Sequence, residues 1–107
     1  MNHLDIAKKL DAAAHSAEAI TQWGEKTNFS EEEAYEIQRL SLEERYSRNE
    51  KFVGLKLGFT SFAKMEQMGV HDMIWGRLTD AMWYKDGGTL DLTKFIHPRA
   101  EPEIAFL

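Results

Sequence analysis

Two glutamates separated by a single residue, Glu101 and Glu103, have the spacing in this sequence best suited to holding a metal ion. Side chains at positions i and i+2 of a β-strand point to the same side, about 6.5–7 Å apart. Carboxylates placed in this way repel each other unless a cation or water lies between them, and hard ions such as Mg²⁺ prefer carboxylate oxygens. The alternative is that both glutamates simply face water, and the spacing alone leaves both interpretations open.

Lys56 is a second candidate because of the residues around it. It lies between Leu55 and Leu57 in an apolar stretch and is flanked at i−2 and i+2 by Gly54 and Gly58. In a strand these glycines share a face with Lys56 and allow another group to approach the backbone closely. A lysine in such a pocket binds a substrate carboxylate or exchanges a proton. The alternative is an outward lysine that protects the edge of a sheet.

Hydroxyl and imidazole side chains give weaker signals. Thr60 and Ser61 stand where a short helix over residues 61–68 is expected to begin. Their hydroxyls or amides could bind an anion at that helix start, or they could only cap the helix. His71 and His97 have no partner at the spacing of metal ligands, so neither is predicted to hold a metal.

Two helices are expected to precede these residues. Apolar residues recur at three- and four-residue steps over 3–20, which predicts one amphipathic helix. Ser30 and Glu33 form a capping box that predicts a second helix over 30–49. The apolar residues of that second helix point in two nearly opposite directions, so we expect it to be packed on both sides. A small chain rarely offers two such surfaces, which indicates missing chain or a partner subunit.

The second half of the chain is expected to be richer in strands. Residues 51–59 contain strand-forming residues, Asp86-Gly87-Gly88 predicts a turn between extended stretches, and 104–107 is apolar and strand-like. The sequence therefore predicts an α+β fold, with a helical region over 1–50 and the first part of a β-rich catalytic domain over 51–107. Because the chain stops within an apolar strand, we expect it to be a fragment.

Composition excludes several classes of protein. The chain has 107 residues, of which 43% are hydrophobic and 29% charged, and its formal net charge is −5. A general nucleic-acid binder would carry a basic face instead. Cysteine is absent, which excludes disulfides and thiolate chemistry and suits a cytoplasmic protein. No stretch approaches the roughly 18 apolar residues that a membrane span needs, and the N-terminus does not have the pattern of a signal peptide.

Four stretches together resemble the family of 2-hydroxypentadienoate hydratases and 4-oxalocrotonate decarboxylases, within the fumarylacetoacetate hydrolase superfamily. Residues 53–61, VGLKLGFTS, are similar to the family pattern V-G-x-K-x-G-x-T-S. Residues 63–70 resemble the segment that follows it, and 97–106 resemble the P-R-x-E-x-E-I-A-F strand. Residues 34–38, AYEIQ, look like the A-Y-x-I-Q helix of the family. The resemblance covers nearly the whole chain.

This resemblance implies a site as well as a fold. It implies that Glu101 and Glu103 are two of three carboxylate ligands to Mg²⁺ or Mn²⁺, with the third beyond residue 107, and that Lys56 reaches the active site. The expected fold is a mixed, strongly bent β-sheet with the N-terminal helices packed beside it. The fragment alone would be inactive because its metal site is incomplete. The residues expected to contact the substrate are Thr60, Ser61, Met68, Gly69, Val70 and Ile74.

One position favours the decarboxylase branch over the hydratase branch. Hydratases of the family read P-D-[FY]-G where this chain has Met73 to Gly76, so Ile74 stands in place of their aspartate. An aliphatic side chain neither handles a proton nor orients water. We therefore expect metal-dependent decarboxylation of a small 2-oxo dicarboxylic acid in the degradation of aromatic compounds. A hydratase of the same family and a non-catalytic assembly module are the alternatives. The resemblance also implies a homo-oligomer and pairing with a hydratase, whereas the charge and the lack of a long apolar stretch predict no nucleic-acid or membrane partner.

Overall fold

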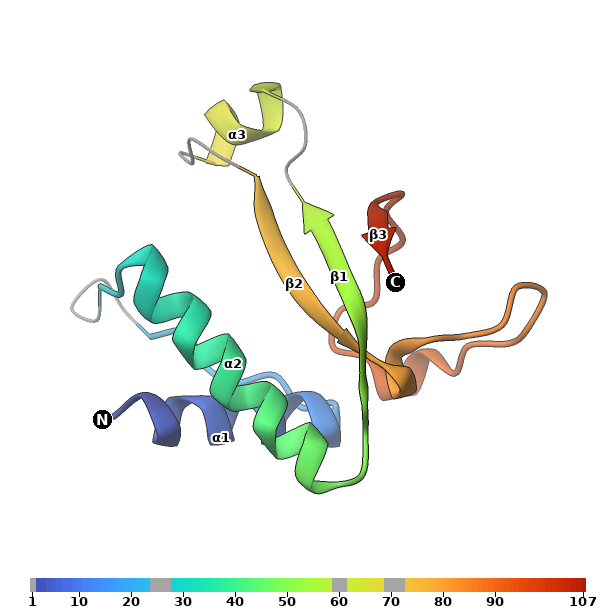
Figure 1. Ribbon diagram of the computed structural model, residues 1–107, viewed down its shortest axis with the longest axis horizontal. Coiled ribbons are helices and arrows are strands. Elements are labelled where there is room, and N and C mark those ends of the chain that lie inside the picture. The colour runs from blue at the N-terminus through green and yellow to red at the C-terminus, as the bar shows by residue number, and fades with distance from the viewer. Residues whose placement is uncertain (1, 24–27, 59–61, 69–72) are drawn as a thin grey trace.

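In the part of the chain that the structure describes, three α-helices accompany a three-stranded sheet (Figure 1). The computed structural model describes residues 2–23, 28–58, 62–68 and 73–107, and the statements below refer to these residues. The predicted α+β class is confirmed. No helix in these ranges is long and apolar enough to cross a membrane.

The first helix, α1 (His3–Ser16), is shorter than the predicted 3–20. Asn2 caps its start by accepting a hydrogen bond from the amide of Asp5. At its other end Ala17 adopts a left-handed conformation with φ of 57°, and its amide donates to the carbonyls of Ala13 and Ala14. This turn closes the last carbonyls of the helix, so the chain leaves the helix before residue 20.

The second helix, α2 (Glu31–Ser47), begins where the capping box predicted. The amide of Glu33 donates to Ser30 Oγ at 3.1 Å, and the amide of Ser30 donates to Glu33 Oε1 at 3.2 Å. Two backbone donors at the helix start are thereby satisfied.

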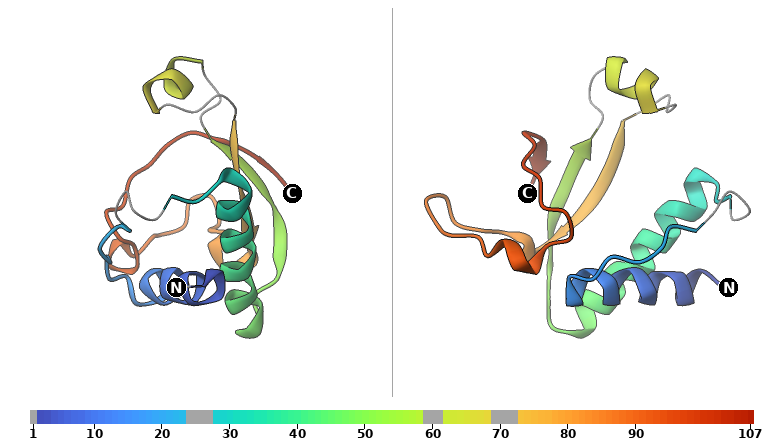
Figure 2. Two further views of the ribbon diagram at one scale, coloured as in Figure 1. Left: turned by 90° about the vertical axis from the view of Figure 1, so that its left-hand side faces the viewer. Right: turned by 180° about the vertical axis from the view of Figure 1, so that it is seen from behind.

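Helix α2 is packed on two sides, as its sequence predicted. On one side Ile37 joins Ile6 and Ala7 of α1 in the core cluster. On another side Tyr35 stacks on Trp75 of the sheet. The ribbon views show α2 beside both α1 and β2 (Figures 1 and 2). Both surfaces come from the same chain, so the packing of α2 on these two sides does not require missing chain or a partner subunit.

The sheet has the strand order β2-β1-β3 and is antiparallel throughout its described part. It consists of β1 (Phe52–Gly58), β2 (Ile74–Thr79) and β3 (Ile104–Phe106). Helix α3 (Phe62–Met68) lies between β1 and β2 in the sequence and beyond one end of their hairpin (Figure 1). The mixed sheet implied by the family resemblance is thus not visible in these three strands.

The connection from β2 to β3 differs from the sequence expectation. The turn at Asp86-Gly87-Gly88 is confirmed, since Gly87 has φ of 79° and the amide of Gly88 donates to the carbonyl of Lys85 at 2.9 Å. The stretches beside it are not strands. The connection instead contains two short 3₁₀ turns, Asp80–Met82 and Leu92–Lys94. The second of these turns is closed locally, because the side chain of Asp91 accepts a hydrogen bond from the amide of Thr93.

A network of charged residues ties the helices to the sheet. Asp11 of α1 is 6% exposed, and Arg48 donates to its two oxygens at 2.6 and 2.9 Å. Glu50, just before β1, accepts from Arg45 at 3.0 Å and from the hydroxyl of Thr79. Burial opposes ionisation of Glu50, but these hydrogen bonds and the charges of Arg45 and Arg48 outweigh it and hold the pKa of Glu50 below its usual value.

Candidate active site

Lys56 lies on the central strand of the sheet. Its cross-strand partners are Gly76 on β2 and Ala105 on β3. An edge lysine would have a neighbouring strand on one side only, so the alternative of a lysine that protects a sheet edge is excluded. The side chain of Lys56 is 51% exposed and therefore lies on an open face of the sheet.

Glu103 is the acidic partner of Lys56 in the structure. Lys56 Nζ lies 3.5 Å from Glu103 Oε2, and the glutamate side chain is 27% exposed. A pair of this length that is open to water contributes little to stability, roughly 0–1 kcal/mol. The pair matters for the site because it places an ammonium group beside one of the two predicted metal ligands.

Gly58 and Gly76 leave room on this face for neighbouring side chains, which the sequence predicted for Gly58 but not for Gly76. A Cβ at Gly76 would lie 3.3 Å from Cε of Lys56, so the lysine side chain crosses directly over this glycine. A Cβ at Gly58 would lie 3.3 Å from Cγ1 of Ile74 and 3.8 Å from Oε1 of Glu103. Ile74, Lys56 and Glu103 are thereby gathered on one face of the sheet.

At the third glycine the neighbouring group is backbone. A Cβ at Gly54 would occupy the space taken by the carbonyl oxygen of Phe106 on β3. Phe52 does not continue the face that holds Gly54, because the pairing register between β1 and β2 shifts between these two residues. The alternation of side chains that places Gly54, Lys56 and Gly58 on one face therefore holds from Gly54 onward.

Both predicted metal ligands line the same pocket as Lys56. This pocket has a volume of about 470 Å³. Glu101 and Glu103 precede β3, which begins only at Ile104, so they are held by irregular backbone and not by the strand that was predicted. The full lining comprises Lys56, Leu90, Leu92, Phe95, Ile96, His97, Pro98, Arg99, Glu101 and Glu103.

The donor set of this pocket suits a divalent cation in part. Two carboxylates offer hard oxygen ligands, which Mg²⁺, Mn²⁺ and Ca²⁺ accept. Within residues 2–23, 28–58, 62–68 and 73–107, no three His, Cys, Asp or Glu side chains are grouped so that they could hold a metal ion. A cation bound by Glu101 and Glu103 would therefore need further ligands from water, substrate or other chain.

The remaining predicted contact residues are only partly visible. Thr60, Ser61, Gly69 and Val70 lie outside the described residues. Met68 is the last residue of α3, and its contact with a substrate stays a prediction. Ile74 is the first residue of β2 and faces Gly58.

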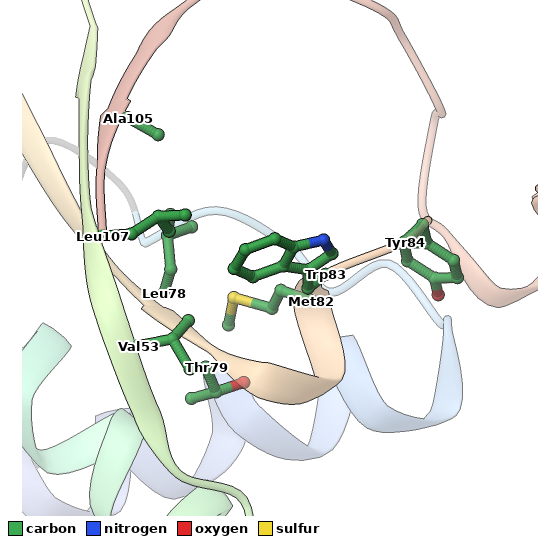
Figure 3. Close-up of a pocket in the computed structure, with 8 residues that line it drawn as sticks. All are labelled: Val53, Leu78, Thr79, Met82, Trp83, Tyr84, Ala105 and Leu107. Carbon is green, nitrogen blue, oxygen red and sulfur yellow. The ribbon is translucent and has the colours of Figure 1, made fainter. Parts of the chain in front are cut away.

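A second pocket, of about 310 Å³, lies beside the sheet near Trp83 (Figure 3). Met82 and Trp83 point toward Leu78 and Leu107 in this view, and none of the eight residues drawn carries a charge. A pocket of this composition has nothing with which to bind a metal or neutralise a carboxylate. The charged residues that the sequence singled out, Lys56, Glu101 and Glu103, line the other pocket instead.

Four residues to which the sequence assigned no role lie in the pocket or contact the strand beneath it. Arg99 and His97 line the pocket, and the proximity of Arg99 to Glu101 in sequence was the available signal. Tyr35 and Gln38 of α2 bond to the backbone of β2 around Gly76. Their only signal was the A-Y-x-I-Q stretch, which carries no chemistry that spacing could reveal.

Comparison with known proteins supports the resemblance. No protein-family model matches the chain. A 4-oxalocrotonate decarboxylase of a Pseudomonas species is 53% identical over 102 residues, which are 95% of this chain and 40% of the relative. One from Pseudomonas putida is 44% identical over 105 residues, or 95% of this chain and 39% of the relative. A 2-hydroxypent-2,4-dienoate hydratase of Pseudomonas putida is 44% identical over 81 residues, which are 75% of this chain and 36% of the relative.

A solved structure gives the same result for the fold. The 4-oxalocrotonate decarboxylase from Pseudomonas putida G7, complexed with calcium and acetate, matches with a TM-score of 0.80 and 37% identity. The match covers 89% of this chain and 37% of that chain. The chain spans about 40% of the length of the first of these relatives. Within that span, it is a homologue of the 4-oxalocrotonate decarboxylases.

Proposed function

We propose that the protein containing this chain decarboxylates 4-oxalocrotonate (2-oxo-3-hexenedioate) to 2-hydroxypenta-2,4-dienoate. The observation that carries the proposal is the grouping of Lys56, Ile74 and Glu103 around Gly58 and Gly76, with Glu101 in the same pocket. The decarboxylase relatives support it, since two of them match over 95% of the chain.

We propose that Glu101 and Glu103 provide two ligands to Mg²⁺ or Mn²⁺. The carboxylate chemistry of the pocket supports a hard divalent ion, and the decarboxylase structure that this chain resembles was determined with calcium. A divalent ion bound there would polarise the 2-oxo group and favour negative charge on its oxygen.

The residues of this chain would act on the two ends of the substrate. The bond between C5 and the distal carboxylate breaks, and its electron pair moves through the alkene to the 2-oxo oxygen, which then takes a proton. The ammonium of Lys56 would neutralise a carboxylate or the developing oxyanion, or transfer that proton. Ile74 would give the departing carboxylate an apolar wall, which favours loss of its charge as CO₂.

The test uses the full-length protein that contains residues 1–107. CO₂ release from 2-oxo-3-hexenedioate is followed with and without Mg²⁺, in the wild type, in Glu103→Gln and in the control Glu32→Gln, which changes an exposed glutamate of α2. We expect metal-dependent CO₂ release that collapses only in Glu103→Gln. No CO₂ release from the wild type would contradict the proposal.

The second candidate is a hydratase, which adds water to 2-hydroxypenta-2,4-dienoate. It is favoured by the relatives that carry this name, one of them 44% identical. Water addition without CO₂ release in the same assay would establish it and would show that Ile74 does not discriminate. The homo-oligomer, the pairing with a hydratase and the cytoplasmic location stay predictions, of which native mass spectrometry of the full-length protein tests the first two.

A further inference from the structure

Strand β2 lies at one edge of the described sheet, and helix α2 occupies that edge with two side chains. The amide of Trp75 donates to the hydroxyl of Tyr35 at 3.2 Å. Gln38 Nε2 donates to the carbonyl of Trp75 at 3.3 Å, and Gln38 Oε1 accepts from the amide of Arg77 at 3.1 Å. Tyr35 and Gln38 are three residues apart, so they lie on the same face of α2.

Side-chain contacts strengthen this attachment. The rings of Tyr35 and Trp75 stack with centroids 4.5 Å apart and an angle of 12° between their planes. The guanidinium of Arg77 lies 4.7 Å from the centre of the Trp75 ring and donates to Gln38 Oε1 at 3.1 Å. Two residues of β2 are therefore fixed both by backbone hydrogen bonds and by their side chains.

Gly76 lies between these two fixed residues. Because side chains alternate along a strand, Trp75 and Arg77 belong to the face toward α2, whereas Gly76 belongs to the face of Lys56. Gly76 is the cross-strand partner of Lys56, whose Cε and Cγ would lie 3.3 and 3.5 Å from a Cβ at this position. Any movement of Trp75 or Arg77 displaces the surface on which the lysine stem rests.

We infer that Tyr35 and Gln38 are positioning residues for the active site. They hold β2 so that Gly76 supports the stem of Lys56 and keeps its ammonium beside Glu103. The expected effect on the reaction rate rests on the proposed decarboxylase function, whereas the expected placement of Lys56 over Gly76 does not. The competing explanation is that both residues only stabilise the fold by covering a strand edge.

Kinetics of the full-length protein separate these explanations. Gln38→Met removes all three hydrogen bonds of the Gln38 side chain at similar length, and Tyr35→Phe removes the hydroxyl while keeping the stacked ring. We expect kcat to fall about tenfold or more in each variant, because a small misplacement of a catalytic group is costly. KM should stay within about twofold, since the substrate's own contacts are retained.

Two further variants complete the design. Gln38→Glu keeps an oxygen for Arg77 and should recover part of kcat. Tyr46→Phe makes the same chemical change in the same helix as Tyr35→Phe. The Tyr46 hydroxyl has no hydrogen-bond partner within the part of the chain that the structure describes, so the kcat of this variant should be unchanged. Loss of thermal stability with unchanged kcat in Gln38→Met would overturn the inference, as would a rise in KM alone.

A spectroscopic measurement tests the geometry independently of turnover. NMR signals of the Lys56 methylene groups and the Gly76 amide are compared in the wild type, Gln38→Met and Tyr46→Phe. Shifts of both signals in Gln38→Met alone support positioning, even if the wild type releases no CO₂ and the proposed function fails. Unchanged signals in an active enzyme would overturn positioning and leave the proposed function standing.

Discussion

The side chain of Lys56 lies across Gly76, with Cε only 3.3 Å from where a Cβ would stand. Gly76→Ala therefore pushes on the stem of the lysine, which yields because it is flexible. We expect a fall in kcat of about tenfold with a change in the free energy of unfolding below about 1 kcal/mol. Steady-state kinetics and urea unfolding measure the two quantities. An equal loss of stability and activity would show that Gly76 is only a packing residue.

Ile74 is predicted to exclude water and charge from the site. Ile74→Asp would place a carboxylate near Gly58 and Glu103, so the departing carboxylate would meet a like charge. We expect CO₂ release to fall at least about a hundredfold, as when an electrostatic contribution to the transition state is lost.

Ile74→Leu keeps the apolar wall and serves as the matched control, with activity within about threefold of the wild type because volume is conserved. Comparable CO₂ release from the aspartate and leucine variants would contradict the role assigned to Ile74.

Gly54 differs from Gly76 because its neighbour is a backbone atom. In Gly54→Ala the new Cβ would overlap the carbonyl oxygen of Phe106, which cannot swing aside as a lysine does. We expect β3 to lose its pairing with β1, and the protein to be destabilised by about 2–3 kcal/mol.

Amide exchange at Leu55 and Leu57, compared with that at Trp75, would report the loss of β1–β3 pairing. Gly87→Ala is the control for glycine removal, because nothing lies within 4 Å of a Cβ at this position. Only the φ of 79° opposes alanine there, so we expect the free energy of unfolding to fall by about 1 kcal/mol.

Glu50 links stability to pH. Its pKa is held below the ordinary value of 4.5, so the unfolded chain binds more protons than the folded one as the pH falls from 4.5 to the folded pKa. The stability that Glu50 contributes is thus complete above pH 4.5 and is lost below it. In Glu50→Gln the free energy of unfolding should fall less steeply below pH 4.5, as urea unfolding at several pH values would show. A slope equal to that of the wild type would contradict this assignment.

Local signals and long-range contacts were not equally predictable. The start of α2 followed from Ser30 and Glu33, because a capping box involves only neighbouring residues. The end of α1 did not, since a left-handed Ala17 has no signal in an alanine-rich run. The pairing of β1 with β3 and the Lys56–Glu103 ion pair both join residues far apart in the chain. The periodicity of the sequence does not specify which distant segments pair, so neither contact could be predicted.

The candidate site shows the same division. Residue type and spacing made Glu101, Glu103 and Lys56 candidates, the family resemblance favoured their role in a site, and the structure brings them to one pocket. The strand geometry expected for the two glutamates was wrong, because β3 begins after them. The support from Tyr35 and Gln38 could not be predicted, since it depends on hydrogen bonds to the backbone of a strand about 40 residues further on.

The strand order has a consequence for the sequence of events during folding. The β1–β2 hairpin and the α1–α2 pair bring together neighbouring segments, whereas β3 must return across the long connection that follows Thr79 before it reaches β1. Closing that loop lowers the entropy of the chain, and no stabilising contact compensates for this loss until β3 pairs with β1. We therefore expect Lys56 to be in place before Glu103 arrives, so that the charged pocket is the last part of this region to form and the first to open.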